Sequence, residues 1–322
     1  MRLAFTQCSS HELISAGFIY VINFGLSQEE IDEQYDIAKA LFDSPLPEKE
    51  KLRADLEKGE YFGYKPFGLR EVKPGVPENT EVYNIPSVGQ QVERPHPAVL
   101  TKNRASIEKF STHIRDQIVA KLFELFAIVL ELPEDYFLDF HKKDEVNSSY
   151  MRYMKYHSRT PEQNAALENI WLKGHTDFGS LTLLFRQPIA ALQVRTPSGD
   201  WKYVKPYPES LTVNVADTLQ FLSNGFLKSS IHRVVAPPSD QAHLDRLGVL
   251  YFVRPGDYVK LKGAKSAVLK REGLLANEDD TVELTAKDWI SSRVIANISS
   301  KEIQVEKEDL NKIGDGLMPV YT

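Results

Sequence analysis

The segment GHTDFGSL, residues 174–181, places a histidine and an aspartate two positions apart in sequence that is typical of a β-strand. Side chains at positions i and i+2 of a strand point to the same face, so His175 and Asp177 can bind one ion together. A second histidine, His232 in SSIHRVV, lies in another strand-like segment. Two imidazoles and one carboxylate form a facial triad that binds iron(II) and leaves coordination positions open. We therefore predict an iron(II) site made of these three residues.

A buried cation is predicted on a later strand. In DRLGVLYFVRP, the alternate positions from Arg246 to Arg254 would face inward. A guanidinium inside an apolar barrel is costly unless an anion pairs with it, and its shape suits a carboxylate. We therefore predict that Arg246 binds one carboxylate of a small dicarboxylate, whose other end chelates the metal. An ion pair with Asp217 or another acid is the alternative.

The elements that must position these residues change in type near residue 145. From residue 146 onward, short strand patterns alternate with turns rich in Gly, Pro, Asn and Asp. The eight strand segments are SSYMRYMKYH, NIWLKGHTD, SLTLLF, ALQVRT, WKYV, SLTVNVA, SSIHRVVA and LGVLYFVR. Such a series predicts a double-sheet jelly roll, also called a double-stranded β-helix.

Helical patterns dominate the first 145 residues. Ser27 and Glu30 form a capping-box sequence at the start of one helix, and apolar residues at three- and four-residue steps predict a long amphipathic helix over 105–132, ended by Pro133. The charged run over 47–60 predicts a solvated helix face. A helical pattern returns at 285–300. The predicted fold is mainly β, with a jelly-roll core buttressed by N-terminal helices.

We expect one structural domain with three regions. These are an N-terminal helical and edge-strand region over 1–145, a core for iron and co-substrate over 146–256, and a C-terminal extension with a helix over 257–322.

Composition excludes several classes of function. The 322 residues carry a net charge of -6 and no basic stripe, so nucleic acid is not an expected partner. No secretory signal and no apolar run of about 18 residues is present, so we expect neither secretion nor membrane insertion. The single cysteine, Cys8, excludes disulfides within the chain and multi-cysteine metal sites. A cytoplasmic location is expected, and no feature predicts an oligomeric state.

The stretch from about Tyr150 to Pro255 resembles the iron(II)/2-oxoglutarate-dependent dioxygenases of the isopenicillin N synthase-like family, common in plant and fungal specialised metabolism. The segments that match the family in order and spacing are HTDFGSLTLLF, ALQV, TVNVADTLQFLSNGFLKSSIHRVVAPP and DRLGVLYF. Upstream, AGFIYVINFGLS and YFGY are similar to two further family segments.

The resemblance implies a complete set of cofactors and roles. Iron(II) would bind the triad, with 2-oxoglutarate and dioxygen as co-substrates, and Arg246 and Tyr156 would bind the distal carboxylate of 2-oxoglutarate. For Tyr156, ordinary barrel packing is the alternative. A small molecule, expected to be a secondary metabolite, would be hydroxylated, desaturated or rearranged while 2-oxoglutarate is decarboxylated to succinate.

Three departures from the family pattern affect these expectations. Gly248 stands where serine is usual, and His157 where proline is usual. The family's N-terminal strand and much of its first helix have no obvious counterpart before Ala16. Because the serine hydroxyl is missing, an iron-dependent oxidase of the same fold that does not use 2-oxoglutarate stays open. A jelly-roll binding protein without catalysis is the other alternative.

Further cations predict the character of the substrate. Arg152 shares a strand face with Tyr156, and Arg254 shares one with Arg246. Extra guanidiniums beside an apolar wall favour an anionic or phenolic small molecule. Alternatively, Arg254 points to solvent and Arg152 pairs with Glu145. The predicted wall consists of Phe178, Phe252, Tyr64 and Phe221.

Overall fold

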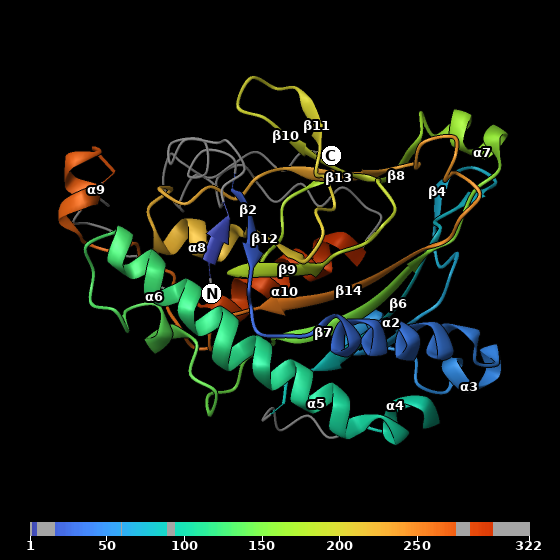
Figure 1. Cartoon of the computed structure of the whole chain (residues 1–322), viewed down its shortest axis with the longest axis horizontal. Coiled ribbons are helices and arrows are strands. Elements are labelled where there is room, and N and C mark those ends of the chain that lie inside the picture. The colour runs from blue at the N-terminus through green and yellow to red at the C-terminus, as the bar shows by residue number, and fades with distance from the viewer. Residues whose placement is uncertain (1, 5–16, 59, 89–93, 275–283, 299–322) are drawn as a thin grey trace.

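The structure is a computed structural model that describes residues 2–4, 17–58, 60–88, 94–274 and 284–298. Cys8 lies outside the described residues. Two antiparallel sheets form the centre of the molecule, and helices cover the outer face of the larger sheet (Figure 1). The mainly β fold with flanking helices that the sequence predicts is confirmed. Within the described residues, no helix has both the length and the apolar character to span a bilayer.

The major sheet has eight strands and includes N-terminal and core segments. In spatial order they are β1 (Arg2–Ala4), β2 (Phe18–Ile22), β12 (Ser210–Val215), β9 (Leu181–Phe185), β14 (Arg246–Val253), β7 (Tyr150–Tyr156), β6 (Thr80–Pro86) and β3 (Gly63–Lys65). The minor sheet contains β11 (Trp201–Tyr203), β10 (Leu192–Arg195), β13 (His232–Val235) and β8 (Ile170–His175). A small ribbon pairs β4 (Glu71–Lys73) with β5 (Val76–Pro77). Each of the eight predicted strand segments contains a strand.

Helices lie mostly in the first half of the chain. They are α2 (Gln28–Asp43), α3 (Leu46–Glu50), η1 (Leu56–Lys58), α4 (Ala98–Lys102), α5 (Arg104–His113), η2 (Ile114–Val119), α6 (Ala120–Val129) and η3 (Leu138–Phe140). The later ones are α7 (Pro161–Ala166), α8 (Asp217–Leu222), α9 (Ala267–Arg271) and α10 (Ala286–Ile298). The capping box at Ser27 and Glu30 is formed as predicted. The long helix is also confirmed, because α5 and α6 lie along one continuous helix (Figure 1). The segment that joins them, η2, is π-helical.

The main hydrophobic core lies between the outer face of the major sheet and the helices α2, α5 and α6. Strand side chains that point to this face alternate with those that point between the two sheets. The outer-facing core residues of the sheet include Val21, Leu183, Val213, Val249 and Tyr251, and the helices contribute Leu41, Phe110, Ile114 and Leu122. The alternating positions on the inner face are thereby left to line the space between the sheets.

The strand register contradicts one predicted pocket residue. Tyr64 pairs with Tyr83, Tyr83 with Tyr153, and Tyr153 with Val249, so all four share the outer face. Tyr64 is 1% exposed. The prediction that it lines the wall of the pocket is therefore wrong, because the register places its side chain on the helix-covered side of the sheet.

The charged run over 47–60 is not simply a solvated face. Lys49 is 5% exposed and donates to Glu81 Oε1 at 2.6 Å, and Tyr64 donates to the same oxygen at 2.6 Å. Burial raises the pKa of Glu81, but hydrogen bonds from His157, Lys49 and Tyr64 outweigh it and hold the pKa at about 2. A buried charge is tolerated here because it is paired and fully hydrogen-bonded.

The N-terminal edge also differs from the expectation. β1 pairs antiparallel with β2, with Arg2 opposite Ile22, and extends the major sheet. The sequence offered no obvious counterpart of the family's N-terminal strand before Ala16, but the structure has a short strand there. Three residues carry little hydrophobic periodicity, so a short edge strand of this kind leaves almost no signal in the sequence.

Candidate metal centre

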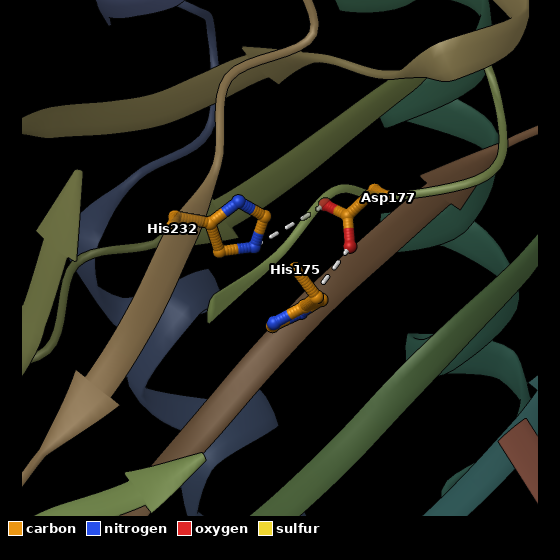
Figure 2. A group of neighbouring side chains, drawn as sticks. All are labelled: His175, Asp177 and His232. Atoms are coloured by element: carbon orange, nitrogen blue, oxygen red, sulfur yellow. Dashed lines mark ion pairs between the residues drawn. The ribbon is translucent and has the colours of Figure 1, made fainter. Parts of the chain in front are cut away.

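The three predicted metal ligands meet between the two sheets. His175 ends β8, His232 begins β13, and the two residues pair directly across the minor sheet. Asp177 follows β8 by two residues, and its carboxylate faces both imidazoles (Figure 2). His175 Nε2 is 3.9 Å from Asp177 Oδ1, and His232 Nε2 is 3.8 Å from Asp177 Oδ2. One ligand atom from each residue lies within 4.8 Å of the other two, so the group could hold one metal ion.

Backbone carbonyls fix the orientation of both imidazoles. His175 Nδ1 donates to the carbonyl of Lys173 at 2.9 Å, and His232 Nδ1 donates to that of Ser230 at 3.1 Å. Because each Nδ1 carries the hydrogen, each Nε2 presents its lone pair toward Asp177. Burial and the neighbouring His232 lower the pKa of His175 to about 4, so this ring is neutral at pH 7, as a ligand must be.

The major sheet holds the carboxylate of Asp177. Oδ2 accepts hydrogen bonds from Thr182 Oγ1 at 2.7 Å and from Asn214 Nδ2 at 2.9 Å. These two residues pair directly across β9 and β12. Burial raises the pKa of Asp177, but the two histidines and these hydrogen bonds outweigh it, so the pKa lies below the usual value. The carboxylate is ionised, and its Oδ1 keeps free lone pairs for a cation.

Sequence reasoning missed Thr182 and Asn214. The signal that could have found Asn214 is a single amide side chain in β12, where every residue is buried. A buried amide needs hydrogen-bond partners, so such a position indicates a polar group nearby. Which group it is depends on the folding of β8 and the loop after it against β12.

The predicted carboxylate clamp has the expected placement. Arg246 pairs with Tyr156 across β14 and β7, and its guanidinium carbon lies 5.4 Å from the centre of the Tyr156 ring. Arg246 is 5% exposed, its Nε has no hydrogen-bond partner, and it forms no ion pair within the described part of the chain. The alternative ion pair with Asp217 does not form. Asp217 instead accepts from Ser229 at 2.7 Å and from Thr176 at 3.2 Å.

A buried guanidinium without an ion-pair partner is suited to bind an anion. A buried charge without a partner destabilises a protein, so such a residue is typical of a binding site. Burial raises the pKa of Tyr156 to about 12, so its hydroxyl stays neutral and can donate a hydrogen bond. The donor sets therefore match the groups they were predicted to hold: nitrogen and carboxylate oxygen for iron(II), guanidinium and phenol for a carboxylate.

Arg152 and Phe252 lie on the inner face, as predicted. Arg152 donates from Nε to Asn84 Oδ1 at 2.8 Å, and its guanidinium carbon lies 4.8 Å from the centre of the Phe252 ring. Phe252 stacks on Tyr150 with ring centres 4.7 Å apart. The alternative pair with Glu145 does not form, and no carboxylate of the described residues lies within ion-pair distance of Arg152. A second cation therefore faces the inside of the barrel.

Arg254 has a different environment. It is 5% exposed, so the alternative in which it points to solvent does not apply. Its Nη1 donates to the hydroxyl of Tyr61 and, at 3.1 Å, to that of Ser148. The guanidinium also lies against the rings of Tyr61 and Tyr150, at 4.7 and 5.0 Å from their centres. These contacts hold β14 to neighbouring segments and leave Arg254 less available to a ligand than Arg152.

The two remaining aromatic residues of the predicted wall form a cluster with the C-terminal helix. Phe221 packs edge-on against Trp289 of α10, with ring centres 5.3 Å apart, and Phe178 belongs to the same cluster. Arg293, also on α10, lies 5.1 Å from the Phe178 ring. Sequence reasoning did not connect α10 with the residues beside Asp177, because that contact is entirely non-local.

Two family models match most of the chain in consecutive segments. Residues 141–255 match the 2OG-Fe(II) oxygenase superfamily. Residues 8–105 match the N-terminal region described as non-haem dioxygenase in morphine synthesis.

Homoarginine-6-hydroxylase 2-ODD-233 of Oryza sativa subsp. japonica is 30% identical over 237 residues, which are 68% of this chain and 69% of that protein. The chain belongs to the 2OG-Fe(II) oxygenase superfamily. It is an iron(II)/2-oxoglutarate-dependent dioxygenase, with 2-oxoglutarate and dioxygen as co-substrates.

Other relatives of the oxygenase agree in sequence or fold. The UPF0676 protein C1494.01 of Schizosaccharomyces pombe is 29% identical over 288 residues, covering 86% of the oxygenase and 84% of that protein. The crystal structure of a full-length Neurospora crassa protein, in complex with alpha-KG and thymine, has a TM-score of 0.75 at 22% identity and covers 89% of each chain. This likeness confirms the jelly-roll fold of the oxygenase.

Proposed function

We propose that the oxygenase oxidises an anionic small molecule, with His175, Asp177 and His232 as the iron ligands. Arg246 and Tyr156 bind the distal carboxylate of 2-oxoglutarate. The proposal rests on one observation. A pre-oriented His-Asp-His group and a buried guanidinium without an ion-pair partner lie inside the same barrel.

The residues of the chain contribute geometry and electrostatics. When bound, iron and 2-oxoglutarate would supply the oxidising chemistry: 2-oxoglutarate gives carbon dioxide and succinate, which takes one atom of dioxygen, and in a hydroxylation the substrate takes the other. Thr182 and Asn214 orient Asp177 and help to keep it ionised, and the Nδ1 hydrogen bonds orient both imidazoles so that their Nε2 atoms could bind the metal. Arg246 fixes one end of the co-substrate, so its other end meets the metal in a defined position.

Charge balance supports an anionic substrate. Iron(II), Asp177, the two carboxylates of 2-oxoglutarate and Arg246 together have no net charge. Arg152 adds one positive charge on the inner face that no carboxylate of the described residues compensates. A substrate with one negative charge would compensate it, and the Phe252 and Tyr150 rings beside Arg152 favour an apolar or aromatic body. A small molecule is supported by the thymine complex of the Neurospora crassa protein. The family resemblance supports a proposed role in secondary metabolism.

Anaerobic titration tests the metal and co-substrate assignment. Addition of iron(II) and then 2-oxoglutarate to the protein should produce a weak visible charge-transfer band. His175→Ala and Asp177→Ala should lose the band and all but about a tenth of succinate formation, while circular dichroism shows an intact fold. An unchanged band and unchanged succinate formation in both variants would contradict the assignment of His175 and Asp177 as iron ligands.

The substrate class has its own test. A panel of aromatic and aliphatic monocarboxylates is compared with the matching methyl esters, and succinate formation above the uncoupled rate is measured. The acids should stimulate turnover and the esters should not. Stimulation by esters as strong as by acids would contradict a role for Arg152 in binding a negative charge.

A further inference from the structure

A buried glutamine lies next to the Arg246 clamp. Gln187 follows β9 by two residues and is 5% exposed. Its Nε2 donates to the backbone carbonyl of Leu247 at 2.5 Å, which identifies the nitrogen end of the amide, because a carbonyl can only accept. One N–H of this amide is thus used, and the second remains. Oε1 is buried and has no partner within the described residues.

Gly248 provides the space that this amide occupies. A Cβ added at Gly248 would lie 2.5 Å from Gln187 Nε2, closer than non-bonded atoms approach. The amide nitrogen therefore takes the place of a side chain at position 248. Positions 246 and 248 of β14 face the same side, since they pair with Tyr156 and Met154 at alternate positions of β7. Gln187 thus presents an N–H on the inner face, at the same-face position next to Arg246.

Both side chains are costly to the fold as they stand. Arg246 Nε and Gln187 Oε1 are each buried without a partner, and an unsatisfied buried polar group destabilises a protein. Two such groups at neighbouring inner positions are typical of a binding site rather than of packing.

We propose that Gln187 is the second arm of the co-substrate clamp. The free N–H of its amide donates to the distal carboxylate of 2-oxoglutarate that Arg246 binds, and Gly248 is required because any larger residue would displace the amide. A carboxylate offers about four lone-pair positions, so it can accept from the guanidinium, the phenol and the amide together. This inference rests on the proposed function of Arg246.

The test measures equilibrium binding rather than turnover. The Mn(II)-loaded protein is titrated under nitrogen by calorimetry with 2-oxoglutarate and, separately, with 2-oxopentanoate, which has the same carbon chain but no distal carboxylate. Gln187→Met fills similar space without donors. It should weaken binding of 2-oxoglutarate about tenfold, as expected for one hydrogen bond to a charged group, and change binding of 2-oxopentanoate by less than about twofold.

Gln193→Met is the matched control. Gln193 is another buried glutamine, 8% exposed, which accepts from Arg233 Nε at 2.8 Å. It adjoins Val194, the partner of His232 in β10, and therefore faces away from the metal centre. Its replacement should leave the binding of both keto acids unchanged.

A second pair of variants tests the shared space. Gly248→Ser should weaken 2-oxoglutarate binding while Gln187 is present, because the new side chain displaces the amide. In a Gln187→Ala background the same Gly248→Ser change should instead strengthen binding relative to Gln187→Ala alone, because the hydroxyl then has room and supplies the donor.

The outcomes separate this inference from the proposed function. Wild-type protein that binds no 2-oxoglutarate would overturn the function of Arg246 and this inference with it. Normal wild-type binding with an unchanged affinity in Gln187→Met, or an equal loss for both keto acids, would overturn the role of Gln187 alone. If Gln187→Met does not fold, the opposite effects expected of Gly248→Ser in the two backgrounds decide the question.

Discussion

Replacement of Arg246 by leucine separates a binding role from a structural one, because the two roles predict opposite effects on the protein without ligands. Arg246 is 5% exposed and forms no ion pair or hydrogen bond within the described residues. Leucine removes the charge and keeps an apolar side chain. Since no ion-pair or hydrogen-bond partner is lost and a buried unpaired charge is removed, the free energy of unfolding of the ligand-free protein should stay the same or rise.

The effect on co-substrate binding should be large. A guanidinium that binds a carboxylate with two charge-assisted hydrogen bonds in a desolvated site contributes about 2 to 4 kcal/mol. The dissociation constant of 2-oxoglutarate should therefore rise roughly 30- to 900-fold. The thermal stabilisation that a fixed concentration of 2-oxoglutarate gives the Mn(II)-loaded protein should decrease accordingly, because it depends on the ratio of ligand concentration to dissociation constant.

Thermal unfolding with and without 2-oxoglutarate measures both effects in one experiment. Arg233→Leu is the control, because Arg233 lies 4.1 Å from the centre of the Trp201 ring and bonds Gln193. That variant should lose stability and keep its response to 2-oxoglutarate. If Arg246→Leu instead unfolds at lower temperature and keeps its affinity for 2-oxoglutarate, Arg246 is a structural residue and the clamp assignment is refuted.

Three further predictions concern other parts of the site and the core. Asn214→Ala removes a donor to Asp177 Oδ2 and should weaken iron(II) binding by about ten- to a hundredfold in a metal titration, with the fold retained; unchanged affinity would contradict this role. Arg152→Gln should raise the Michaelis constant of an anionic substrate about tenfold, whereas Arg254→Gln should lower the unfolding temperature and change that constant by less than twofold. Burial lowers the pKa of His141 from 6.5 to about 4. As the pH falls, the imidazole is therefore protonated in the unfolded chain before it is protonated in the folded protein. The free energy of unfolding should fall by about 3 kcal/mol as the pH drops from 6.5 through 4. In chemical denaturation, His141→Gln should reduce this fall, and an equally steep fall would show that His141 is not its source.

Local pattern was sufficient for much of the fold. Strand periodicity between turn residues located the eight strand segments of the second half, and apolar spacing located the long helix. These features depend on residues close together in the chain, so they can be recognised without knowing which distant segments pack against them. Where a segment is very short, as in β1, or where charge pairing is non-local, as between Lys49 and Glu81, the local signal is absent or misleading.

The proposed metal ligands illustrate the same division. His175 and Asp177 were found because two residues of strand-like sequence place both side chains on one side, and His232 because it lies in a strand of its own. Alternation along the strand DRLGVLYFVRP likewise predicted the inward guanidinium of Arg246, and the family resemblance then supplied the ligand expected there. In each case the residue type and its spacing to nearby residues were enough to identify the functional group.

Tertiary structure decided which side chains share a face and which share a space. Pairing with Tyr83 turned Tyr64 toward the helices, the contact of Asp177 with Asn214 joined the metal site to the major sheet, and the approach of Gln187 filled the space above Gly248. A shift of one residue in strand register moves a side chain to the opposite face of a sheet, so these contacts depend on pairing across distant segments. The sequence by itself determined the candidate functional groups of this oxygenase. The packing of its two sheets and helices determined the neighbours of these groups, because each neighbour comes from a distant part of the chain that local spacing does not describe.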